Sequence, residues 1–121
     1  MMTREEAFER LSKSKFRNSF RLTRADLEQA GRYGRETVRR HLADFVREKL
    51  APAIPEKDGR QTPYRGHPAF KAMHGCAMCC RVCMNRWWKV PEGVRLSEAR
   101  QRKAVDFMMA WLDRRGAWKG A

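Results

Sequence analysis

The sequence predicts an all-α protein of four to five helices, folded as one compact domain over residues 1–121. Apolar residues recur at helical spacing in several segments, most of them preceded by a residue that commonly caps a helix. No alternation of apolar and polar residues extends beyond a few positions, so strands are not expected. Hydrophobic residues make up 42% of the chain, which argues against wholesale disorder and supports a core that does not depend on disulfides.

Residues 1–50 predict the N-terminal helices. Thr3 and Glu6 have the spacing of a capping box, which predicts a short first helix. Thr23 with Asp26 predicts the start of a second helix, which we expect to stop near Gly31.

Residues 36–50 predict a longer amphipathic helix with one apolar stripe. The stripe consists of Val38, Leu42, Phe45, Val46 and Leu50. A glycine-containing turn separates this helix from the one before it. Such a pair is compatible with a DNA-binding helix-turn-helix, but it equally describes any two packed helices.

Two further segments complete the predicted domain. Residues 51–67 contain three prolines and the Asp58-Gly59 pair, and they predict an extended connector with turns. Residues 97–115 predict a C-terminal helix, capped by Ser97 and ended by Gly116.

The charge of the chain indicates a polyanionic partner. The sequence contains 27 Lys and Arg against 14 Asp and Glu, a formal net charge of +13. Residues 59–91 contain six cationic residues and no acidic one, and residues 10–25 form a second acid-free run that also contains two phenylalanines. Cations, hydroxyl groups and aromatic faces together favour nucleic-acid binding over a merely solvated basic face. The predicted nucleic-acid contacts are Lys13, Lys15, Arg17, Arg21, Arg24, Arg60, Arg65, Lys71, Arg81 and Arg86.

No run of about 18 apolar residues is present, and the first nine residues are acidic rather than apolar. We therefore expect neither a membrane span nor a secretory signal, and a cytoplasmic location.

Residues 68–90 contain all four cysteines, as two abutting Cys-x-x-Cys pairs. In an intracellular chain such pairs indicate a metal site or redox chemistry before a structural disulfide. If the segment were one helix, the four cysteines would share a face, and His67 and His74 would point to the opposite one. A mixed Cys and His site therefore needs a break in the helix, for which Gly75 is the natural position. The candidate metal ligands are Cys76, Cys79, Cys80, Cys83, His67 and His74.

Several chemistries remain open for this segment. Zinc would take two or three of Cys79, Cys80 and Cys83, completed by a histidine among residues 41, 67 and 74. An iron–sulfur cluster would use all four cysteines, although their spacing matches neither common ferredoxin pattern. A redox or nucleophilic thiol would be favoured by Arg81 beside Cys80. The remaining alternative is that the cysteines are small apolar core residues.

Three stretches of the chain resemble a known family: LSKSKFR at 11–17, LAPAIPEKDGRQTPYRGHPAF at 50–70, and His74 followed by CCRVC at 79–83 and Trp87. They are similar to a small bacterial and phage family known as domain of unknown function 4186, and the resemblance covers most of the chain. The family has no established activity to carry over. Its recurring positions fall on His41, His67, His74, Cys79, Cys80, Cys83 and Trp87. Cys76 departs from the family pattern, as does Trp88, where the family usually has a histidine.

We therefore expect a small basic protein, stabilised by a Cys and His metal site and binding nucleic acid largely through phosphates. The first alternative is an enzyme acting on nucleic acid or nucleotides, using His67 and His74 with a cysteine-bound metal or a cysteine nucleophile. No deaminase motif or glycine-rich phosphate loop is present, so we favour a binding protein over an enzyme. The second alternative is an adaptor or inhibitor that binds an acidic protein surface.

Overall fold

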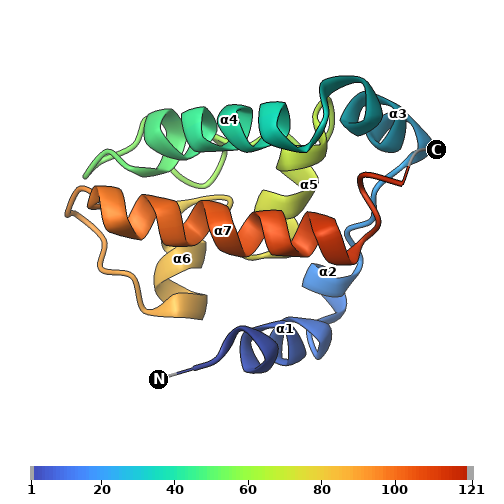
Figure 1. The fold of residues 1–121 in the computed structure, drawn as a ribbon. Coiled ribbons are helices and arrows are strands. Elements are labelled where there is room, and N and C mark those ends of the chain that lie inside the picture. Colours follow the sequence, from blue (N-terminus) through green and yellow to red (C-terminus); the bar gives the residue numbers. More distant parts are fainter. Residues whose placement is uncertain (1, 120–121) are drawn as a thin grey trace.

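The computed structural model describes residues 2–119, which form helices joined by turns and contain no strand. This confirms the all-α prediction, but seven α-helices and one π-helical turn form instead of the expected four to five helices. In chain order they are α1 (Arg4–Ser12), α2 (Lys15–Asn18), α3 (Arg24–Tyr33), α4 (Arg35–Phe45), the π-helical turn η1 (Val46–Leu50), α5 (Pro68–Gly75), α6 (Arg81–Trp88) and α7 (Glu98–Arg114) (Figure 1).

The predicted helix starts are present in the structure. Thr3 and Glu6 form the capping box of α1, and Thr23 and Asp26 form that of α3. The end of α3 differs from the prediction, because the helix continues past Gly31 and stops at Gly34, whose φ of +82° suits glycine.

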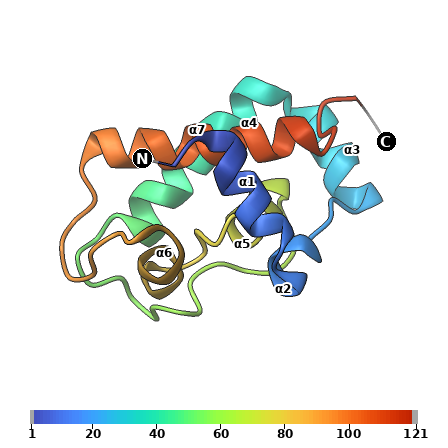
Figure 2. The same ribbon diagram turned by 90° about the horizontal axis from the view of Figure 1, so that it is seen from below.

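The helices α4 and α7 lie side by side (Figure 1). The helix α5 contacts both of them, and it also contacts α2 and α3. The helices α1 and α6 lie on the side of α7 that faces away from α4, as the view from below shows (Figure 2). The core is therefore built around α7, whose Met108 and Leu112 are fully buried together with Leu42 of α4 and Met73 of α5.

The cysteine segment is two helices rather than one. The helix α5 ends at Gly75, and residues 76–80 form a turn in which Ala77 has a left-handed φ of +58°. Gly75 lies against Trp111 of α7, and a Cβ atom at residue 75 would come within 2.7 Å of the indole. The break places Cys79 and Cys80 just before α6 and Cys83 in its first turn.

Residues 51–67 contain no helix and run along the surface of the fold, as a connector would. The connector is fastened by Arg81, which is 1% exposed and donates to the carbonyl oxygens of Leu50 and Pro52 as well as to those of Pro91 and Val94. Among residues 2–119, no helix is both long enough and apolar enough to cross a bilayer.

Candidate metal centre and basic surface

Three sulfur atoms meet at the N-terminus of α6. The Sγ atoms of Cys79, Cys80 and Cys83 all lie within 4.8 Å of one another. The local backbone produces this arrangement, because Cys80 is the N-cap of α6 and its Sγ accepts a hydrogen bond of 3.3 Å from the Cys83 amide. The Thr62 hydroxyl donates to the Cys79 carbonyl oxygen at 2.7 Å and holds the connector against the cluster.

A buried arginine from a distant part of the chain completes the cluster. Arg17 of α2 is 7% exposed, and its guanidinium donates to the Sγ atoms of Cys83 at 3.1 Å and Cys79 at 3.6 Å, and to the His74 carbonyl oxygen at 2.8 Å. No carboxylate of the described residues forms an ion pair with it. A buried cation needs a compensating negative charge, so the sulfur atoms are its natural partners.

The cysteines differ in their readiness to ionise. The pKa of Cys83 is lowered because the thiols of Cys79 and Cys80 donate to its sulfur and Arg17 stabilises the thiolate. The pKa of Cys79 is raised by its hydrogen bonds to Cys80 and Cys83 and by burial. Of the three clustered thiols, Cys83 is therefore the one whose ionised form is most favoured, and its negative charge would compensate that of Arg17. A thiophilic cation would displace the remaining protons.

His67 lies apart from the cysteine cluster, and both of its ring nitrogens are occupied. The Ala69 amide donates to Nδ1 at 3.0 Å, which caps α5. The Nε2 atom consequently carries the proton and donates to Nδ1 of His41 at 2.9 Å. The two histidines form a pair beside Tyr33, whose ring stacks on His67.

His74 and Cys76 are also engaged elsewhere. The Nε2 atom of His74 donates to the carbonyl oxygens of Thr62 and Pro63, at 3.0 and 3.1 Å. Cys76 is fully buried, and burial raises the pKa of its thiol well above the usual value, so it is a small core residue here. Of the six candidate ligands, the fold brings together Cys79, Cys80 and Cys83 and leaves out His67, His74 and Cys76.

Residues 5–113 match the family model described as domain of unknown function DUF4186. The chain belongs to this family. No solved structure matches it. The three clustered cysteines of this DUF4186 chain all lie inside the matched region, as does Arg17.

The ten predicted nucleic-acid contacts of the DUF4186 chain divide into two groups. Seven are exposed, namely Lys13, Lys15, Arg21, Arg24, Arg60, Arg65 and Arg86. Arg17, Lys71 and Arg81 are not exposed, so the fold does not present them on the surface where the predicted contacts would need them. Lys71 forms a 2.8 Å ion pair with the buried carboxylate of Asp26, and the two arginines are buried by the contacts described above.

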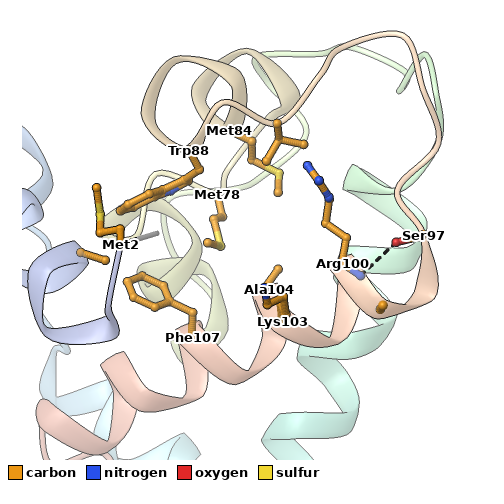
Figure 3. A pocket seen from close by; sticks show the side chains of 12 residues that line it. Met2, Met78, Met84, Trp88, Ser97, Arg100, Lys103, Ala104 and Phe107 are labelled. Carbon is orange, nitrogen blue, oxygen red and sulfur yellow. Dashed lines mark hydrogen bonds between the residues drawn. The ribbon is translucent and has the colours of Figure 1, made fainter.

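The structure also contains a groove that the sequence did not indicate. It has a volume of about 540 Å³ and lies between α6, α7 and the start of the chain. Met78, Met84, Trp88 and Phe107 form its apolar wall, and Arg100 extends from α7 toward Met84 (Figure 3). Met78 lies in the turn before α6, Met84 and Trp88 lie on α6, and Arg100 and Phe107 lie on α7. Because these elements are distant in the sequence, no local pattern could have revealed the groove.

Proposed function

We propose that this protein binds a zinc ion through Cys79, Cys80 and Cys83, and that the metal-stabilised fold presents its basic surface to nucleic acid. The observation that carries the metal proposal is the meeting of three sulfur atoms around a buried arginine. Thiolates are preferred ligands of zinc, and three of them around Zn²⁺ leave a net charge of −1. Arg17 is placed to compensate that charge by donating to two of the three sulfur atoms.

The metal would stabilise the packing of distant parts of the chain against one another. The three sulfur atoms belong to the start of α6, whereas Arg17 belongs to α2. Arg17 also donates to the carbonyl of His74, near the end of α5. An ion at the sulfur atoms would therefore strengthen the contacts of α2 with both helices of the cysteine segment.

Elemental analysis of protein purified without added metal tests the first half of this proposal. We expect stoichiometric zinc in the wild type, and a loss of metal affinity of at least about tenfold in Cys83→Ser because one of the three ligands is removed. Cys76→Ala is the matched control, since Cys76 lies outside the cluster, and it should retain the metal.

Replacement of zinc by cobalt should add thiolate charge-transfer absorption that Cys83→Ser weakens and Cys76→Ala preserves. Metal-free protein that remains unchanged when zinc is supplied would contradict the metal proposal. Iron in the purified protein, together with the brown absorption of a cluster, would contradict the zinc proposal and support the iron–sulfur alternative.

The nucleic-acid half of the proposal is supported by the cations that have no acidic partner. Within residues 2–119, five of the exposed predicted contacts form no ion pair; these are Lys15, Arg21, Arg60, Arg65 and Arg86. Binding through phosphates releases counterions, so the logarithm of the affinity should fall steeply and linearly with the logarithm of the salt concentration. An affinity that does not change between about 50 and 200 mM salt would contradict this half of the proposal.

One observation favours an enzyme as the second candidate. The described residues bring three ligands together, and catalytic zinc sites commonly have three protein ligands and one open position. His67→Asn and His74→Gln, tested separately for fold, metal content and turnover of nucleotide substrates, distinguish the candidates. Loss of turnover with retained fold and metal would favour the enzyme.

A further inference from the structure

Four aromatic rings from three parts of the chain meet beside the cysteine cluster. The rings of His74 and Tyr64 are stacked, with centroids 4.1 Å apart and planes inclined by 7°. Phe20 stacks on His74 at 5.2 Å, and Phe16 packs edge-on against Phe20 at 5.1 Å. The fold thereby unites the two acid-free runs, since Phe16 and Phe20 belong to residues 10–25 and the other two rings to residues 59–91.

Two of these rings face solvent. Tyr64 is 60% exposed and Phe16 is 53% exposed, although both are large aromatic side chains. His74 covers one face of Tyr64 at 4.1 Å. Phe20 also stacks on Tyr64 at 6.1 Å, but its ring is only 5.2 Å from His74, too near to lie across the opposite face. Neither ring therefore covers the outer face of Tyr64. His74 is itself fixed by two hydrogen bonds to the connector, so the ring beneath Tyr64 is immobilised. The surface is therefore organised before any ligand arrives.

Cations flank each part of this aromatic surface. Lys15 precedes Phe16, Arg21 follows Phe20, and Arg65 follows Tyr64 in the chain. All three cations are exposed, and none forms an ion pair with a described carboxylate. Aromatic faces next to unpaired cations match a ligand with alternating flat bases and phosphates.

We propose that Phe16, Phe20 and Tyr64, with Lys15, Arg21 and Arg65, bind single-stranded nucleic acid, and that one base stacks on the outer face of Tyr64. This inference rests on the nucleic-acid-binding function proposed above and specifies its substrate class. A duplex can offer phosphates to the cations, but its bases are already stacked on one another, whereas the bases of a single strand are free to stack on protein rings. An acidic protein surface would use the cations but would leave the outer face of Tyr64 unused.

Fluorescence anisotropy with a short labelled oligodeoxythymidine, and with a duplex of the same length, tests the inference on the full chain. We expect the single strand to bind more tightly than the duplex at equal salt. Tyr64→Ala should weaken single-strand binding about tenfold and leave duplex binding nearly unchanged, because it removes one stacked base. Tyr64→Phe retains the ring and should bind like the wild type.

Two further variants separate stacking from charge and from general loss of apolar surface. Arg65→Gln should reduce the slope of log affinity against log salt for the single strand by about 1, the equivalent of one phosphate contact. Tyr64→Ala should leave that slope unchanged. Ile54→Ala removes a residue that is 86% exposed outside the aromatic surface, and it should bind like the wild type.

The outcomes distinguish failure of the single-strand inference from failure of the proposed nucleic-acid-binding function. If neither oligonucleotide binds, both the nucleic-acid function and the inference are overturned. If single strand and duplex bind equally and Tyr64→Ala has no effect, the inference is overturned while the nucleic-acid function stands. A circular dichroism spectrum of each variant verifies that the fold is retained.

Discussion

Arg17 and Arg21 show, at the scale of single residues, what charge in a sequence does and does not predict. Both belong to the same acid-free run, with an aromatic residue immediately before them. Arg21 is exposed, whereas Arg17 is buried against two sulfur atoms. The difference arises from a partner 62 residues or more away in the chain, so no local pattern could have separated the two arginines.

His67 makes a pH-dependent contribution to stability that can be measured. Burial, together with the neighbouring His41, lowers the pKa of His67 to about 4. In the unfolded chain this histidine titrates near its usual value of about 6.5, so between pH 6.5 and 4 the unfolded state binds a proton that the native state does not. We expect the free energy of unfolding to be unaffected by this group above pH 6.5 and to decrease as the pH falls from 6.5 to 4. The decrease from His67 alone should be about 2 kcal/mol, allowing for partial solvent screening of the ring.

Urea denaturation at a series of pH values checks this expectation against His67→Asn. Asparagine is a good N-cap residue and can accept the Ala69 amide, but it does not titrate. The variant is expected to be less stable at neutral pH and to lose less stability on acidification. Parallel pH profiles for the two proteins would show that His67 is not the titrating group.

At the scale of the helices, Gly75 is required by packing. A Cβ atom at residue 75 would lie 2.7 Å from Cζ2 of Trp111, in a region where both residues are buried. The Gly75→Ala variant should therefore lose about 1–3 kcal/mol of unfolding free energy, because a packed indole cannot move aside without disturbing α7. Thermal unfolding followed by circular dichroism measures the loss.

Gly31→Ala is the matched control for this substitution. Gly31 lies inside α3, does not adopt a positive φ, and has no heavy atom within 4 Å of the place that an alanine methyl group would occupy. Alanine there should raise stability by up to about 1 kcal/mol, through its higher helix propensity. If Gly75→Ala and Gly31→Ala changed the free energy of unfolding in the same direction, the close approach of Gly75 to Trp111 would be incorrect.

The same two glycines show which element boundaries a sequence can predict. The starts of α1, α3 and α7 depend on side chains within three residues of the helix, and all three were predicted correctly. At Gly75 the close approach of α5 to α7 involves Trp111, which is 36 positions away, so the sequence could only name Gly75 as a possible position of the break. The end of α3 was predicted wrongly for a local reason: Gly31 is compatible with a helix interior, and the helix stops at Gly34, which has a positive φ.

At the scale of the whole molecule, part of the candidate site was predictable. The spacing of Cys79, Cys80 and Cys83 predicted that some of the cysteines would form a site. Spacing alone could not separate them from Cys76, because that separation depends on the turn at residues 76–80; only the resemblance to the family singled out Cys76. The place of Arg17 beside them, and the union of the two acid-free runs at Phe20 and Tyr64, required the packing of α2 against α5.

The net charge of +13 leads to a prediction for the molecule as a whole. Ion pairs among residues 2–119 are mostly exposed, and exposed pairs contribute little to stability. Repulsion among the unpaired cations should therefore be the larger effect, and it is screened once the Debye length falls below about 10 Å. We expect the melting temperature of the protein alone to rise by a few degrees between about 50 and 500 mM sodium chloride. Nucleic-acid affinity should fall over the same range, because the same cations are then screened from phosphates. A melting temperature that decreases with salt would mean that the ion pairs outweigh the repulsion, and that the exposed cations are compensated within the fold rather than free for a polyanion.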